Sequence, residues 1–145
     1  MAVARSKLID RKVPGIYHCV SRCVRRAFLC GADEYTGQDF EHRRVWILNR
    51  LQELAHAFAV EVLAYAILSN HAHKVLRNRP DIAATWTAEE VAARWLEIFP
   101  KCSPGQPGAI EVNAQEQEAI AGNPRRVETL RRRLSDISWF MRALN

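Results

Sequence analysis

Two histidines, His71 and His73, are the residues of this chain best suited to metal chemistry. One alanine separates them, and they follow an apolar segment at residues 64–68 and a polar pair at 69–70. Side chains alternate between the faces of a β-strand, so both imidazoles point the same way, with Cα atoms about 6.5–7 Å apart. Neutral imidazole is a common ligand of divalent cations. The spacing predicts a metal site with two local ligands on an exposed strand, which differs from a four-ligand structural zinc site.

Three strands are predicted to place this pair. Residues 60–68 are apolar almost throughout, which is typical of a strand covered on both faces. Residues 71–76 form its antiparallel partner after a tight turn at 69–70. An alternating pattern predicts another strand over residues 16–24, with a short partner strand at 27–30.

Helical patterns lie between and after these strands. Apolar side chains recur every three or four positions over residues 40–59, and Asp39 precedes them as a predicted N-cap. Thr87 and Glu90 have the spacing of a capping box at the start of a helix that reaches about residue 99. A short helix is predicted over residues 111–121. The pair Asn123-Pro124 predicts the start of a last helix that runs to the end of the chain.

Strand, helix, strand, strand, helix is most of a ferredoxin-like pattern. We therefore expect an α+β fold in which a ferredoxin-like antiparallel sheet carries helices on one face, followed by a C-terminal helical extension. The single domain of residues 1–145 divides into a core at 13–80 and an extension at 81–145.

Composition narrows the partners and the location. The 145 residues include 21 lysines and arginines against 16 acidic residues, giving a net charge of +5, and arginine supplies most of the excess. Arginine suits bidentate phosphate contacts, so the charge favours a nucleic-acid partner. No apolar stretch has the length of a membrane span, which is about 18 residues or more, and the N-terminus lacks an apolar signal core. We expect no membrane partner, a cytoplasmic location and reduced cysteines.

Three segments together resemble a known family. They are the strand Tyr17-His18-Cys19-Val20-Ser21-Arg22, the helix at residues 43–58, and the strand and turn that lead to Asn70-His71-Ala72-His73. Their order resembles the single-tyrosine HUH transposases, and more closely the REP-associated, transposase-like branch. The resemblance covers roughly residues 14–78, with weaker similarity in the final helix.

The resemblance implies a nuclease and strand transferase that acts on single-stranded DNA, usually at hairpin-bearing ends. It implies that His71 and His73 hold Mg²⁺ or Mn²⁺ against the scissile phosphate, where the ion withdraws charge from the oxygens. It also implies a homodimer and a tyrosine on a C-terminal helix that attacks the phosphorus and keeps the 5′ end as a phosphotyrosine.

The chain departs from the family pattern at the nucleophile. Its three tyrosines are Tyr17, Tyr35 and Tyr65, and none follows the histidine pair. We therefore expect a truncated chain that lacks the catalytic tyrosine, or alternatively a degenerate inactive copy. Cys23 stands where the family usually has glycine, and Lys74 stands where an apolar residue is common.

Basic residues near these segments are the expected DNA contacts, and Arg22 alone among them matches the family motif. The set is Arg22, Arg25, Arg26, Arg43, Arg44, Lys74, Arg77 and Arg79. A solvated surface is the alternative for each one. Two alternatives to transposition also remain: a catalytically inactive nucleic-acid-binding ferredoxin-like domain, and a small metal-dependent hydrolase.

Overall fold

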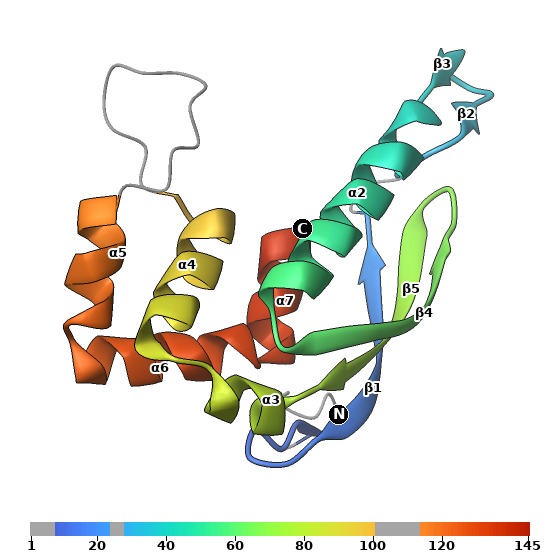
Figure 1. The fold of residues 1–145 in the computed structure, drawn as a ribbon. Helices are drawn as coiled ribbons and strands as arrows, with labels where there is room; N and C mark the ends of the chain where they lie inside the picture. Colours follow the sequence, from blue (N-terminus) through green and yellow to red (C-terminus); the bar gives the residue numbers. More distant parts are fainter. Residues whose placement is uncertain (1–7, 24–27, 101–113) are drawn as a thin grey trace.

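The computed structural model describes residues 8–23, 28–100 and 114–145. Within them the chain has an α+β fold, as expected, with a three-stranded antiparallel sheet and several helices (Figure 1). The elements are β1 (Gly15–Arg22), β2 (Ala32–Asp33), β3 (Gln38–Asp39), α2 (His42–Ala57), β4 (Val60–Ile67), β5 (His71–Asn78), α3 (Pro80–Thr85), α4 (Ala88–Ile98), α5 (Ala114–Ala121), α6 (Pro124–Leu134) and α7 (Ile137–Leu144).

The sheet has the order β1-β5-β4, so β5 is its central strand. β5 runs antiparallel to both neighbours, and α2 connects the two outer strands. Of the three strands of this sheet, the first in the sequence (β1) therefore lies beside the last (β5). This is the arrangement of the β-α-β-β part of a ferredoxin-like pattern. The register pairs Val20 with His73 and Arg22 with His71, which sets the neighbours of the histidine pair.

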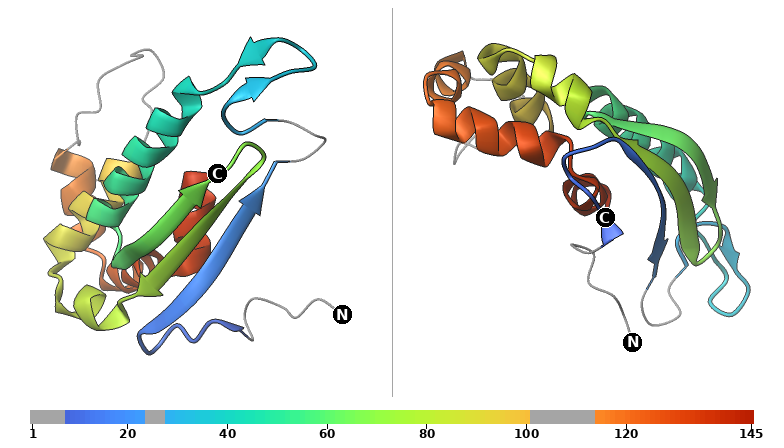
Figure 2. Two further views of the ribbon diagram at one scale, coloured as in Figure 1. Left: turned by 90° about the vertical axis from the view of Figure 1, so that its right-hand side faces the viewer. Right: turned by 90° about the horizontal axis from the view of Figure 1, so that it is seen from below.

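The helices cover one face of the sheet and leave the other open. The left view of Figure 2 shows α7 behind the strands, and buried side chains of both α2 and α7 pack in one cluster with Leu76 of β5. Along β5, Ala72, Lys74, Leu76 and Asn78 are buried, whereas His71, His73, Val75 and Arg77 are only half-buried. This alternation assigns the first set to the helix-covered face and the second to the open face. The core lies between the sheet and α2, α4, α6 and α7.

The strands differ from expectation in several places, and β5 runs to Asn78 rather than to residue 76. β1 ends at Arg22 rather than at residue 24. Residues 28–30 are not a strand, and residues 24–27 lie outside the described part of the chain. The prediction that residues 60–68 are covered on both faces is wrong, because β4 is an edge strand whose Leu63 and Tyr65 are 49% and 55% exposed. Apolar composition alone does not separate a sheet edge from its centre.

The first long helix is shorter than predicted. α2 begins at His42, and its N-cap position is Glu41, so Asp39 is not the cap. Asp39 lies in the small β2–β3 hairpin, where its carboxylate accepts a hydrogen bond from the Glu41 amide at 2.8 Å. The sequence pattern missed this hairpin and also α3, because each is too short to show a period.

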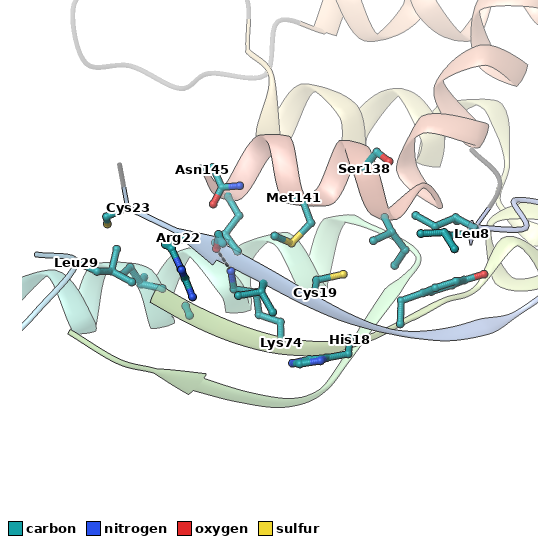
Figure 3. Close-up of a pocket in the computed structure, with 18 residues that line it drawn as sticks. Leu8, His18, Cys19, Arg22, Cys23, Leu29, Lys74, Ser138, Met141 and Asn145 are labelled. Atoms are coloured by element: carbon teal, nitrogen blue, oxygen red, sulfur yellow. Dashed lines mark hydrogen bonds between the residues drawn. The ribbon is translucent and has the colours of Figure 1, made fainter. Parts of the chain in front are cut away.

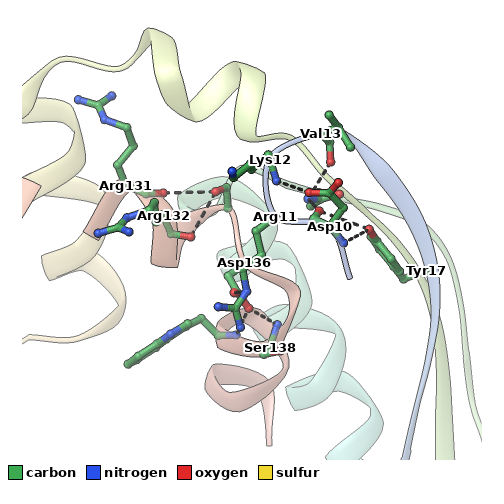
Figure 4. Close-up of polar contacts among 12 residues, drawn as sticks. Asp10, Arg11, Lys12, Val13, Tyr17, Arg131, Arg132, Asp136 and Ser138 are labelled. Atoms are coloured by element: carbon green, nitrogen blue, oxygen red, sulfur yellow. Dashed lines mark hydrogen bonds and ion pairs between the residues drawn. The ribbon is translucent and has the colours of Figure 1, made fainter. Parts of the chain in front are cut away.

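The predicted last helix is two helices. Asn123 caps α6 as expected, and the Thr87–Glu90 capping box of α4 is confirmed. The chain then breaks at Ser135, and the buried Asp136 caps α7 by accepting from the amides of Ser138 and Trp139. Asp136 also pairs with Arg11 at 2.7 Å, so the segment before β1 is tied to the start of α7 (Figure 4).

Candidate metal and nucleic-acid site

The two histidines of the central strand share the open face of the sheet, as their spacing predicts. His71 begins β5 and His73 follows one strand repeat later, and both side chains are half-buried. Their ring centroids are 4.9 Å apart and the ring planes meet at 73°. The strand therefore brings two imidazoles close together without burying either one.

Asn70 fixes the proton of the first ring. Its side-chain oxygen lies 2.5 Å from Nδ1 of His71. An amide oxygen can only accept, so Nδ1 of His71 carries the proton. In the neutral ring, Nε2 then has the free lone pair that a cation needs. Asn70, the second residue of the turn, thus sets the tautomer of His71.

A third histidine, His18, contacts the second ring from β1. Its Nε2 lies 2.8 Å from Nδ1 of His73, the ring planes are 12° apart, and the centroids are 5.0 Å apart. Because the close contact joins nitrogens at the ring edges, the parallel rings are offset and meet edge to edge. The register explains the contact, since His18 is a diagonal neighbour of His73 on the open face.

Sequence reasoning did not assign His18 to the site. The available signal was its place in the alternating pattern of β1, which puts it on the same face as Arg22. What the sequence could not supply was the register between β1 and β5.

The surroundings keep His73 in the form that binds metals. Partial burial lowers the pKa of His73, and the nearby His71 and His18 rings and the charges of Lys74 and Arg22 lower it further. The pKa therefore lies below the ordinary histidine value near 6.5. The ring is neutral at neutral pH, as a metal ligand must be.

The donor set fits a cation that accepts imidazole nitrogen and completes its shell with other oxygen ligands. Among the residues that the structure describes, no group of three or more His, Cys, Asp or Glu side chains is placed to hold a metal ion. The protein would supply His71 and His73, and water or phosphate oxygens would supply the rest. Mn²⁺ accepts such a mixed set more readily than Mg²⁺, which prefers oxygen ligands alone.

Arg22 is the expected DNA contact that lies directly across the strand register from the first histidine, on the same open face. It pairs with His71 across the β1–β5 register, and its side chain is exposed. No carboxylate of the described residues forms an ion pair with it. Arg77 shares this face, 3.7 Å from Glu61. The charge of Arg77 is therefore partly offset by Glu61, whereas no described carboxylate offsets that of Arg22.

The other expected contacts do not join this group. Arg43 donates to the carbonyl of Phe28, and Arg44 donates to the carbonyl of Ile67 and to Glu41, so both brace the N-terminal end of α2. Arg79 pairs with Glu61 and Asp81. Arg25 and Arg26 lie outside the described residues.

Lys74 faces the helices, although it follows His73 in the sequence. It is 1% exposed, and its ammonium donates to the hydroxyl of Ser21. Figure 3 shows Lys74, Cys19 and Met141 in a cavity of about 750 Å³ between the sheet and α7. Burial lowers the pKa of Lys74 from its ordinary value. The sheet thus separates Lys74 from the open face and from any DNA bound there.

None of the three tyrosines faces the histidine pair. Tyr17 pairs with Leu76 and Tyr65 with Lys74, which places both on the alternation of the helix-covered face. Tyr17 accepts a hydrogen bond from the amide of Asp10, and Tyr35 is 98% exposed in the β2–β3 hairpin. The described part of the chain therefore offers no tyrosine hydroxyl to a phosphate held at the histidines.

Comparisons with known proteins add no relative. No protein-family model matches the chain, and neither a curated protein nor a solved structure does. The helices of the described residues include none with the length and apolar character of a membrane span.

Proposed function

We propose that this chain is a metal-assisted single-stranded-DNA-processing domain of the HUH type. In it, His71 and His73 hold Mn²⁺ or Mg²⁺ on the open face of the sheet. The observation that supports this most directly is the pair of imidazoles on that face, whose ring centroids are 4.9 Å apart. Asn70 leaves Nε2 of His71 free, and the exposed Arg22 lies across the register from that ring. The proposal includes a cytoplasmic location, which the composition favours, and the homodimer that the resemblance implies.

Each group has a physical role in the proposal. The cation, when bound, withdraws charge from the oxygens of a phosphodiester and orients it. Arg22 and Arg77 contact neighbouring phosphates and hold the strand along the sheet. Strand cleavage would also need an attacking tyrosine, which the three tyrosines described above do not supply. For these 145 residues we therefore propose metal-dependent binding of DNA and expect no covalent adduct.

The test is the affinity of the full chain for a labelled hairpin-bearing single-stranded DNA, measured by fluorescence anisotropy with and without Mn²⁺. We expect Mn²⁺ to raise the affinity about tenfold, which is about 1.4 kcal/mol. The increase should disappear in the double variant His71→Ala and His73→Ala. His56→Ala is the matched control, because His56 is an exposed histidine on α2, away from the sheet face.

An inactive nucleic-acid-binding domain is the second candidate. The observation that favours it is that the described residues contain only two facing metal ligands and no facing tyrosine. On this alternative, the DNA affinity is the same with and without Mn²⁺, falls with salt, and falls in Arg22→Ala. That result would contradict the metal role of the histidines and leave the sheet face as the binding surface.

A further inference from the structure

We infer that His18 is a positioning residue for the metal site. Its Nε2 accepts a hydrogen bond from Nδ1 of His73, and this leaves Nε2 of His73 free for the cation. The inference deepens the proposed function and rests on it. It assigns to His18 a task that the sequence did not reveal, that of setting the tautomer of a neighbouring ligand.

The first proposed ligand, His71, already has a defined proton position. Asn70 can only accept through its side-chain oxygen, so His71 has a proton on Nδ1 and a lone pair on Nε2. Two rings on one strand face bind one cation together only if the second ring also presents a lone pair. Nδ1 of His73 is already occupied by the 2.8 Å contact with His18. Nε2 is therefore the one ring nitrogen of His73 that remains to coordinate a cation.

A hydrogen bond between two neutral imidazoles needs one proton, and its direction decides the outcome. If His18 donated, His73 would have its own proton on Nε2 and could not bind a cation there. If His18 accepts, Nε2 of His73 is bare. Metal-binding histidines commonly donate their other ring N–H to an acceptor that fixes the ring orientation. Asn70 and His18 then have the same role, because each accepts a hydrogen bond from Nδ1 of one of the two ligands.

The contact geometry assigns His18 to support rather than to ligation. Its Nε2 is directed at the edge of the His73 ring, and the near-parallel planes hold the two rings edge to edge. The described residues contain no group of three side chains placed around one ion, so His18 is not a third ligand.

Two variants of His18 separate the acceptor from the ring. His18→Gln replaces the accepting nitrogen with an amide oxygen that can also accept from Nδ1, whereas His18→Phe keeps a ring that cannot accept. We expect His18→Phe to weaken Mn²⁺ binding 10–100-fold, in the range typical of lost supporting contacts. His18→Gln should stay within about threefold of the parent, or about 0.6 kcal/mol. The readout is electron paramagnetic resonance of free Mn²⁺, with His42→Phe on α2 as the control.

A second measurement needs no metal. Nitrogen-15 chemical shifts of the imidazoles in the metal-free chain report which ring nitrogen has the proton. We expect His73 to be protonated on Nδ1 in the parent and in His18→Gln, and to shift toward the Nε2–H form in His18→Phe. Equal Mn²⁺ affinity in His18→Phe and the parent would overturn the inference.

The two measurements also separate this inference from the proposed function. A parent chain in which His73 is protonated on Nε2 would overturn the role of His18, whatever Mn²⁺ does. A parent chain that does not bind Mn²⁺, although His73 is protonated on Nδ1, would contradict the metal-dependent function and support the proton assignment to His18.

Discussion

The two faces of β5 differ in burial and in polar partners, as the four consecutive residues 71–74 show. On the open face, His71 and His73 are half-buried, and each ring is held by a polar neighbour. On the helix-covered face, Ala72 and Lys74 are 2% and 1% exposed. Side chains that open to solvent can exchange partners with a ligand, whereas those under the helices are committed to the fold.

This difference shows that residues next to each other in the sequence need not lie at the same site. Lys74 is next to His73 along the chain, and on that basis it is an obvious phosphate contact. The pleat directs it to the other side of the sheet, where it bonds to Ser21 under α7. His18, which is 55 residues from His73, is the side chain that contacts the histidine pair. Strand register therefore decides which residues form the site.

The largest expected effect contrasts a side chain from each face. Leu76→Ala removes a fully buried leucine from the core cluster and should lower the free energy of unfolding by about 3 kcal/mol. Val75→Ala, on the open face, should cost less than about 1 kcal/mol, since part of that side chain already meets solvent. Urea denaturation of both variants measures the difference. Equal losses would contradict the assignment of faces.

Much of this arrangement could be predicted from the sequence. The alternating and helical periods gave the fold class, the β4–β5 hairpin, the caps of α4 and α6, and the shared face of the histidine pair. These features depend on residues within one turn or one strand of each other. Local periodicity is set by backbone geometry, which explains why a single sequence is enough to find them.

The remaining features depend on packing between distant segments. Asp136 is a residue type that caps helices, but the apolar period continues through the break, so the period alone does not show that α6 ends at Leu134. The apolar run at 60–68 does not show that β4 is an edge strand. Likewise, the contact of His18 with His73 requires the pairing of β1 with β5, which links residues 49 to 63 positions apart.

A second prediction tests whether Lys74 belongs to the helix-covered face. Replacing it by methionine keeps a long flexible side chain but removes a charge that no described carboxylate pairs with. A buried charge without a partner opposes folding, so Lys74→Met should raise the free energy of unfolding by about 1–2 kcal/mol. Affinity for hairpin DNA should stay unchanged, because the open face is untouched.

The control for this change is Lys74→Arg, which keeps the charge in a larger group and should destabilise the chain. Chemical denaturation gives the free energy, and anisotropy gives the DNA affinity. Loss of DNA affinity in Lys74→Met with the fold intact would contradict the separation of the two faces. It would return Lys74 to the set of DNA contacts.

The weakest effect is expected at Arg79, the residue directly after the end of β5. Arg79 pairs with Asp81 at 2.7 Å and with Glu61 at 2.6 Å. The hydrogen bonds from Arg79 lower the pKa of Asp81 below its ordinary value of 3.8. A carboxyl group with a lowered pKa in the folded state stabilises that state above the ordinary pKa. The contribution is lost as the pH falls through the folded pKa.

Asp81→Asn should therefore lower the thermal midpoint slightly at neutral pH, and the gap from the parent should close as the pH falls below about 4. Because the pair is exposed to solvent, salt should reduce the same gap. In an Arg79→Met background, Asp81→Asn should lose its pH dependence, because the guanidinium that lowers the pKa is absent. A gap that stays constant with pH in the parent background would show that Asp81 acts through the start of α3 and not through its charge. The end of β5 would then be stabilised independently of the ion pairs that Arg79 forms with Asp81 and Glu61.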